Sequence, residues 1–274
     1  SDGGAWSGDA AFAVETSVVP QGIGADTIAT LDGFSREDVD AYALESQRRA
    51  SHARDSGYFD GSVVPVVDIN GFEILRRDDF IKPQSTLEGL AALRASFESM
   101  GGMGFDDLVL KKYNFLDRIH HVHTPGNSSG IVDGASAVLI GSKQAGRDLG
   151  LKARGRVVAG AILASDPIIM LTAPGPSARK CLKTAGLSIK DIDLWEINEA
   201  FAAVALRYMR DLDLDHAVTN VNGGAIALGH PLGATGAMLV STMLDELERR
   251  DLYRGMLSLC VGGGMGISCI IERA

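Results

Sequence analysis

The segment Asn220-Val-Asn-Gly-Gly-Ala-Ile-Ala-Leu-Gly-His-Pro-Leu-Gly-Ala-Thr-Gly236 is unlike ordinary secondary structure, because it combines several glycines with one histidine and one proline. Glycine lets the backbone approach a ligand closely, and Pro231 both fixes its own φ and disfavours helix at His230. The apolar run that follows predicts a buried helix over 237–250. We therefore predict a rigid loop that presents the His230 imidazole for catalysis.

The composition is that of an ordinary globular protein. The 274 residues are 46% hydrophobic and 22% charged, which allows one large or two modest domains. A net charge of −9 argues against a nucleic-acid surface or a polybasic membrane patch. Three cysteines are typical of a reduced, cytoplasmic chain rather than a disulfide framework. No stretch approaches the roughly 20 apolar residues of a transmembrane helix.

The second half of the sequence predicts α/β architecture, because apolar strands alternate with helices. The strands alternate little between polar and apolar residues, as expected when helices cover both sheet faces. We predict strands over 134–141, 156–164, 192–197, 256–261 and 266–272, and helices over 177–185, 199–210 and 237–250.

The first half has weaker patterns. We expect residues 1–34 to be extended and irregular, and a helix to run from an N-cap at Ser35 toward Gly57. The segment 105–119 is apolar over much of its surface; it either packs on the body of the protein or docks to a membrane or partner. Further predictions are short strands over 62–67 and 72–75, and helices over 86–97 and 105–119.

Three residues with useful chemistry lie at strand or helix ends. Asn198 follows a buried strand, where ligands bind in open α/β sheets, but an asparagine there could equally cap the next helix. Cys260 precedes a run of glycines whose N–H groups could bind an oxyanion; the alternatives are a core thiol or a dinucleotide loop. The strand predicted next, at 266–272, excludes the dinucleotide loop. With His230, these groups favour acyl transfer, and a cysteine hydrolase stays open.

The remaining cysteines and histidines have less specific settings. Cys181 and Cys269 lie within apolar elements and are predicted to be structural. The cluster His120, His121 and His123 lacks the regular spacing of metal ligands, so we predict no metal site. His52 and His216 are predicted to be solvated surface residues.

Three motifs together resemble the thiolase family. They are Asn198-Glu-Ala-Phe-Ala202, the glycine-rich segment from Gly223 to Gly236, and Cys260-Val-Gly-Gly-Gly-Met-Gly266. The resemblance is greatest to the 3-ketoacyl-CoA thiolase subunits of fatty-acid β-oxidation complexes. It implies a layered α/β/α core of mixed five-stranded sheets with buried helices, plus an α+β loop domain. It also implies a loop domain at 1–125, the end of an N-terminal core domain at 126–150, and a C-terminal core domain at 151–274.

The resemblance also implies roles for individual residues. Cys260 would be the acid/base cysteine, while His230 would activate a nucleophilic cysteine and, with a water held by Asn198, stabilise an enolate or thioester oxygen. The Gly262 N–H would contribute to a second oxyanion hole. Coenzyme A would be a substrate rather than a cofactor, and Lys82 and Arg94 are candidate anchors for it by residue type. Positions that match the pantetheine or acyl path are Ser129, Met170, Ala200 and Phe201.

One departure from the family pattern affects the whole interpretation. The family's nucleophile is a cysteine in a Cys-x-Ser loop of the N-terminal core domain, and no cysteine of this sequence matches it. We expect that the sequence begins after that region; the alternative is a non-catalytic, thiolase-like partner subunit. The resemblance further implies a homo-oligomer, a dimer or tetramer, that could associate with a hydratase/dehydrogenase subunit.

Overall fold

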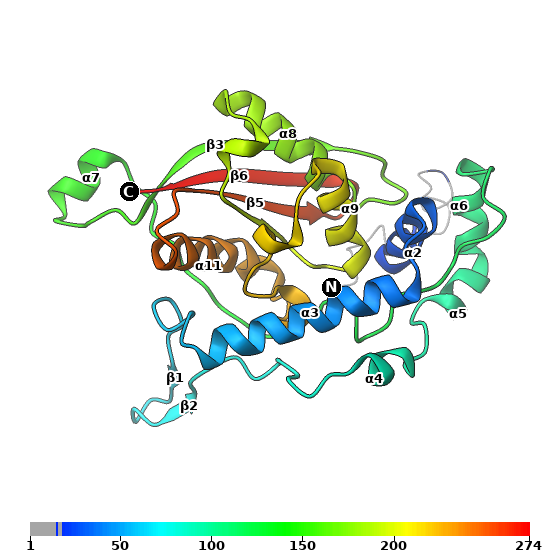
Figure 1. The fold of residues 1–274 in the computed structure, drawn as a ribbon, viewed down its shortest axis with the longest axis horizontal. Helices are drawn as coiled ribbons and strands as arrows, with labels where there is room; N and C mark the ends of the chain where they lie inside the picture. Colours follow the sequence, from blue (N-terminus) through cyan, green and yellow to red (C-terminus); the bar gives the residue numbers. More distant parts are fainter. Residues whose placement is uncertain (1–14, 16–17) are drawn as a thin grey trace.

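A four-stranded mixed sheet forms the centre of the computed structural model, which describes residue 15 and residues 18–274. The strand order is β3-β6-β5-β4, with β3 antiparallel to β6, β6 antiparallel to β5, and β4 parallel to β5 (Figure 1). A single parallel bridge from Trp195 to Thr219 lies beyond β4, so among the described residues the sheet has four strands rather than the five that the resemblance implied. The strands are β3 (Gly155–Ala164), β4 (Leu194–Ile197), β5 (Arg254–Val261) and β6 (Met265–Arg273).

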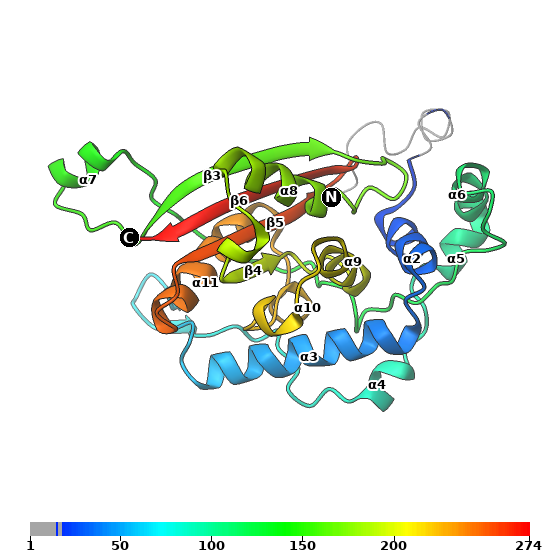
Figure 2. The ribbon, with the colours of Figure 1, turned by 45° about the horizontal axis from the view of Figure 1, so that its top comes forward.

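Helices cover both faces of this sheet because its strands are apolar on both sides. In β5, Met256 belongs to the core under α8 (Pro174–Ala185) and α9 (Ala202–Leu212), whereas its neighbour Leu257 faces α11 (Thr235–Arg249). The pair Ile270 and Ile271 in β6 repeats this division. Figure 2 shows the sheet between these helices. The α/β prediction is therefore confirmed, although the first half of α11 is only half-buried rather than fully buried as expected.

A long helix, α3 (Arg36–Asp55), crosses beneath this layered part. Ser35 caps it as predicted, because the Ser35 hydroxyl accepts from the Asp38 N–H while the Asp38 carboxylate accepts from the Ser35 N–H. The expectation that 1–34 is irregular was wrong for α2 (Gln21–Asp32), a helix buried almost all round. The extended, irregular structure predicted for residues 1–14, 16 and 17 lies outside the described residues.

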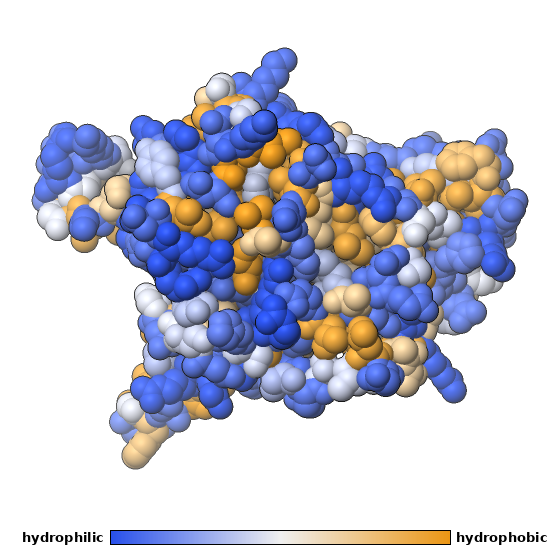
Figure 3. All heavy atoms as spheres, in the orientation of Figure 1, coloured by the Kyte–Doolittle hydropathy of each residue, from blue (hydrophilic) through white to orange (hydrophobic). Residues whose placement is uncertain are grey.

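The rest of the first half contains short elements. The helix predicted over 86–97 ends at Ala91, and the helix predicted over 105–119 is confined to residues 106–112. The strands predicted over 62–67 and 72–75 form only a small hairpin. Val109 and Ile119 are buried in the main core, so the segment 105–119 packs on the body, and Phe115 stays 71% exposed. Apolar side chains also lie at the tip of the hairpin (Figure 3). The elements are β1 (Val66–Val67), β2 (Glu73–Leu75), α4 (Leu87–Ala91), α5 (Glu98–Met100), a π-turn (Gly101–Phe105) and α6 (Asp106–Lys112).

The strand predicted over 134–141 was wrong. Residues 131–142 form no bridge with any described residue, and apolar side chains such as Leu139 and Ile140 are exposed there. No described strand lies beside the segment to supply ladder hydrogen bonds, so its apolar sequence is not enough to make it a strand. It leads to α7 (Lys143–Asp148), which protrudes from the body (Figure 1).

Four short helices complete the described structure: Ile189–Asp191, His216–Val218, α10 (Ala225–Leu228) and Leu232–Ala234. None of the helices in the described part of the chain is both long and apolar enough to span a bilayer.

Candidate active site

Asn198 and His230, predicted separately from two motifs, lie together in the structure. The Asn198 Nδ2 is 3.4 Å from the His230 Nε2, and Asn198 is only 1% exposed. The helix-cap alternative for Asn198 was wrong: α9 begins at Ala202 rather than Glu199, and its N-cap residue is Phe201. The Asn198 side chain is therefore turned toward the imidazole instead of a helix end.

His230 is fixed through both its ring and its backbone. Its Nδ1 lies 2.6 Å from the Thr235 hydroxyl, in the first turn of α11, and its N–H donates to the Gly130 carbonyl at 2.8 Å. Burial lowers the pKa of His230, so the imidazole is neutral at physiological pH. A neutral imidazole with one nitrogen held by a hydroxyl is arranged to act as a general base through the other nitrogen.

Cys260 lies near the end of β5, the strand that pairs with β4. The Asn198 N–H donates to the Ser258 carbonyl at 3.0 Å, which places Asn198 beside this end of β5. Burial raises the pKa of Cys260 to about 11, so the thiol is protonated at neutral pH and can donate a proton. No hydrogen bond joins Cys260 to Asn198 or His230 among the described residues.

The glycines after Cys260 form the turn between β5 and β6. Gly263 and Gly264 have φ of 80° and 86°, and Val261 pairs with Met265 across the turn. A hairpin, not a helix, follows, which confirms that this is no dinucleotide-binding loop. Gly262 is exposed at this turn, at the end of the strand that carries Cys260.

Three of the four residues matched to the pantetheine or acyl path lie together. The Ser129 N–H and hydroxyl both donate to the Ala200 carbonyl, at 3.0 and 3.1 Å, and Phe201 forms a β-bridge with Ser128. Met170 lies in the main core with a strained φ of 29°. The candidate coenzyme A anchors Lys82 and Arg94 belong to the first half; the Lys82 ammonium lies over the Phe80 ring.

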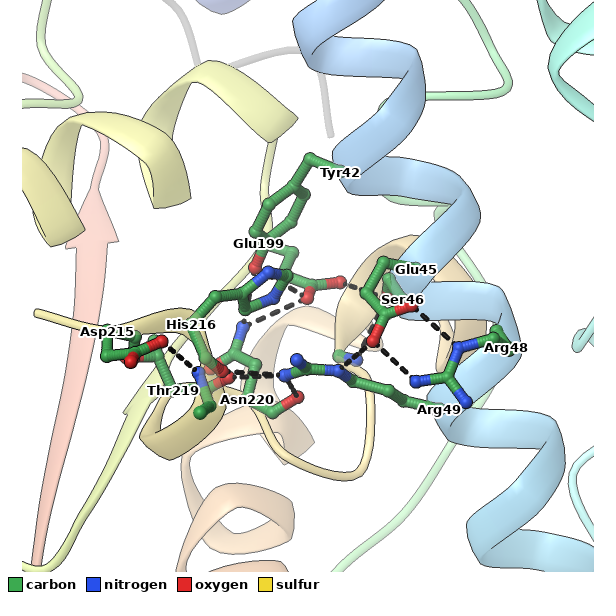
Figure 4. A network of polar contacts seen from close by, with 12 residues as sticks. Tyr42, Glu45, Ser46, Arg48, Arg49, Glu199, Asp215, His216, Thr219 and Asn220 are labelled. Atoms are coloured by element: carbon green, nitrogen blue, oxygen red, sulfur yellow. Dashed lines mark hydrogen bonds and ion pairs between the residues drawn. The ribbon is translucent and has the colours of Figure 1, made fainter.

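A buried carboxyl group that sequence reasoning missed holds this site in place. Glu199 is fully buried and accepts four hydrogen bonds: from the Tyr42 hydroxyl (2.9 Å), the Ser46 hydroxyl (2.7 Å), the Asn220 side chain (3.0 Å) and the Ile226 N–H (3.1 Å). Figure 4 shows α3 and the glycine-rich segment meeting at this carboxyl. Burial raises the pKa of Glu199, and the donated hydrogen bonds oppose that shift.

The close contact of the glycine-rich segment with α3 and Glu199 explains why residues 223 and 224 are glycines. A Cβ on Gly223, whose φ is 73°, would lie 2.5 Å from the Ser46 carbonyl oxygen, and a Cβ on Gly224 would lie 2.5 Å from the Glu199 carboxyl carbon. Only glycine lets the loop pass this close to α3 and to Glu199. The position of the loop that carries His230 is thus set by residues of the first half.

The histidine cluster is a hydrogen-bonded pair of histidines around one aspartate. Asp26 contacts His121 Nδ1 at 2.8 Å and His123 Nδ1 at 2.7 Å, while His121 Nε2 lies 3.0 Å from Asp106. Within residue 15 and residues 18–274, neither this cluster nor any other group of three or more His, Cys, Asp or Glu side chains is arranged to hold a metal ion. His216 is not the solvated residue that we predicted, because it is half-buried and stacks on Tyr42 with centroids 4.9 Å apart.

The comparisons with known proteins agree with one another. Family models of the thiolase N-terminal and C-terminal domains match residues 9–104 and 151–273. A 3-ketoacyl-CoA thiolase of Aliivibrio fischeri is 40% identical over 258 residues, which are 92% of this chain and 62% of the relative. An acetyl-CoA acetyltransferase of Rhizobium meliloti is 39% identical, covering 92% of this chain and 60% of the relative.

Solved structures give the same result. A crystal structure of human mitochondrial 3-ketoacyl-CoA thiolase in complex with CoA superposes with a TM-score of 0.82 at 39% identity, covering 93% of this chain and 59% of that one. A Bacillus anthracis acetyl-CoA acetyltransferase gives a TM-score of 0.81 at 36% identity, covering 93% and 60%. This chain spans about three fifths of the length of these relatives. With matches along both parts of the chain and the same fold, the chain belongs to the thiolase family.

Proposed function

We propose that the protein to which this chain belongs is an acetyl-CoA C-acyltransferase that cleaves 3-ketoacyl-CoA with free CoA, as in fatty-acid β-oxidation. The reaction is a reversible Claisen condensation, so it needs a base, an acid and donors for an enolate oxygen. The observation that carries the proposal is the pair Asn198–His230, 3.4 Å apart, with the Asn198 N–H bonded to Ser258 of β5, two residues before Cys260.

The site supports a division of roles. The neutral His230 imidazole takes the proton of a nucleophilic thiol, and with a water held by Asn198 it provides donors for the thioester or enolate oxygen. Cys260, protonated because burial raises its pKa to about 11, donates the proton to the departing enolate. The Gly262 N–H stabilises the oxyanion of the tetrahedral intermediate. Ser129, Ala200 and Phe201 line the acyl or pantetheine path, together with Met170; coenzyme A is a substrate, and the reaction uses no cofactor or metal.

None of the cysteines in this sequence matches the nucleophile of the family. The three cysteines are Cys181, Cys260 and Cys269, and none occupies a Cys-x-Ser loop. We propose that the nucleophile belongs to a longer form of the protein, since the relatives are longer than this chain. The active form would be a homo-oligomer, alone or together with a hydratase/dehydrogenase subunit. Exposed apolar residues such as Ile69 and Phe72 on the β1–β2 hairpin support association. A free thiol at Cys260 favours a cytoplasmic location.

The test is a thiolysis assay with 3-ketoacyl-CoA and CoA. The longer protein should show ping-pong kinetics, and His230→Ala or Cys260→Ala should abolish turnover while leaving the circular dichroism spectrum unchanged. Full activity in either variant would exclude this assignment. If the longer protein binds CoA without turnover, the chain is instead the non-catalytic thiolase-like partner.

A further inference from the structure

Glu196 is a buried carboxyl group to which the proposed mechanism gives no role. It is 3% exposed in the middle of β4, at a position where the neighbouring residues Leu194 and Ile197 are apolar. Within the described part of the chain it forms no ion pair and no side-chain hydrogen bond, unlike Glu199 and Glu246. Burying a carboxyl group without partners is costly, so the position calls for an explanation.

Glu196 lines a small cavity together with Asn198. Residues two apart in a strand share a face, which places both side chains on the side of α11. The cavity has a volume of about 20 Å³, which is room for one ordered water, and its polar lining includes Thr235 and Thr242. The Asn198 Oδ1 is buried and receives no hydrogen bond from any described residue. A buried acceptor without a donor and a buried carboxyl without a partner therefore share one cavity.

We propose that Glu196 is a neutral acid that, through a water in this cavity, donates the hydrogen bond that Asn198 Oδ1 lacks. Glu196 is then a positioning residue, and this role rests on the proposed function. The Asn198 carboxamide can rotate by half a turn, which exchanges the positions of Oδ1 and Nδ2. Its hydrogen-bond partners determine which of the two atoms faces the cavity. A donor at Glu196 keeps Oδ1 in the cavity and Nδ2 toward His230. A carboxylate at Glu196 would accept instead, attract Nδ2 into the cavity, and remove one donor from the site.

The charges around Glu196 favour its neutral form. Burial first, and then the charges of Glu199 after β4 and Glu246 on α11, raise the pKa of Glu196 well above its ordinary value. Arg49 on α3 acts in the opposite direction. As pH rises through this elevated pKa, Glu196 loses the proton it donates, and the Asn198 amide loses the neighbour that orients it.

The kinetic test compares Glu196→Gln with Glu196→Leu in the active protein. Glutamine keeps a neutral donor at the same place, so we expect kcat within about twofold of wild type. Leucine removes the donor, and we expect kcat to fall at least tenfold with KM for CoA unchanged. Wild type should lose kcat at alkaline pH where Glu196→Gln does not. Met238→Leu, in the same cavity lining, controls for disturbed packing and should leave kcat unchanged.

Two further measurements do not depend on activity. Infrared difference spectra at pH 7 should show the C=O stretch of a protonated carboxyl in wild type and lose it in Glu196→Gln. Because the folded-state pKa of Glu196 is raised above 4.5, wild-type stability should fall relative to Glu196→Gln as pH rises from there.

An ionised Glu196 at pH 7, or a Glu196→Gln variant as impaired as Glu196→Leu, overturns the proposal. If Glu196→Leu does not fold, the kcat of Glu196→Gln and the pH dependence of wild-type kcat test the proposal instead. If no variant has thiolase activity but the infrared band is present, the proposed function fails and neutral Glu196 stands.

Discussion

The hydroxyl of Ser46, near the middle of α3, donates a 2.7 Å hydrogen bond to the carboxyl of Glu199, which lies 153 residues further along the chain. The same hydroxyl accepts from the Gly224 N–H at 3.1 Å. One side chain of the first half thus contacts both the segment after β4 and the loop that leads to His230.

Replacing Ser46 by alanine should destabilise the fold by about 2 kcal/mol. The variant removes a buried hydrogen bond to a carboxyl group and leaves the Gly224 N–H without a partner. Denaturant unfolding measures the change. Ser51→Ala, on the same helix, is the matched control: its 3.4 Å contact to Asp55 is exposed, so the free energy of unfolding should change by less than about 0.5 kcal/mol. Equal effects of the two variants would contradict the proposed importance of the Glu199 contacts.

Gly223→Ala should cost about 3 kcal/mol of stability or more. The new methyl group would meet the Ser46 carbonyl oxygen, and the φ of 73° is unfavourable for alanine. Gly233→Ala in the same glycine-rich segment has nothing within 4 Å of its added Cβ, and its thermal midpoint should stay close to that of wild type. If Gly223→Ala were as stable as Gly233→Ala, the loop would not be pressed against α3 as described.

His121 should stabilise the protein below pH 6.5 and progressively less at higher pH. Both of its ring nitrogens face carboxylate oxygens, so both must carry protons, and the hydrogen bond to Asp26 is the main cause that raises the pKa of His121 to about 9. A raised folded-state pKa contributes stability that is complete below the unfolded value near 6.5 and is lost by about pH 9. His121→Gln should therefore cost on the order of 2 kcal/mol at pH 6 and little at pH 9.5.

The measurement is chemical unfolding of both proteins across this pH range. His52→Gln, which replaces an exposed imidazole, is the control for the general effect of exchanging histidine for glutamine. A His121→Gln effect that grew with pH would show that the imidazole is neutral in the folded protein.

Thr235→Val should lower kcat of the active protein roughly tenfold or more. The valine cannot bond the His230 Nδ1, so the imidazole loses the partner that sets its tautomer and ring orientation. Thr235→Ser keeps a hydroxyl at the same position and should retain most of the activity in the thiolysis assay. Similar losses in both variants would point to packing by the threonine methyl group instead.

Cys260 should react slowly with iodoacetamide at pH 8, roughly a hundredfold more slowly than the thiol of an unstructured peptide. Only the thiolate reacts, and burial raises the pKa of Cys260 to about 11. Peptide mapping by mass spectrometry distinguishes Cys260 from Cys181 and Cys269. Rapid modification at pH 8 would mean that the thiol is already ionised, and it would not suit the proposed proton donor.

The parts of the fold that could be predicted are those whose patterns are local. The strands over 156–164 and 256–261 are continuous apolar runs, and the Asn198, His230 and Cys260 motifs lie at element ends that meet at one sheet edge. The helix α2 was missed because its sequence contains two glycines and no polar face; burial, not propensity, makes it a helix. The strand over 134–141 failed for the opposite reason: its apolar pattern needs a pairing strand that the described residues do not supply.

Contacts distant in sequence could not be predicted. In the sequence, Glu199 is only the second residue of the motif that begins at Asn198. Its hydrogen-bond partners Tyr42 and Ser46 lie more than 150 residues away. Likewise, the spacing of the histidine cluster gave no indication of the carboxylates that it contacts, Asp26 and Asp106. A spacing rule considers neighbours along the chain, and these side chains become neighbours only in the fold.

The four hydrogen bonds on Glu199 also determine what can fold as an independent unit. Family models divide the sequence near residues 104 and 151, yet two of the four donors come from α3, on the far side of that division. Residues 151–273 expressed alone would keep the carboxyl and lose the Tyr42 and Ser46 hydroxyls. The boundary that separates the two halves in sequence therefore does not separate them in folding cooperativity: α3 and the glycine-rich segment should unfold in a single transition.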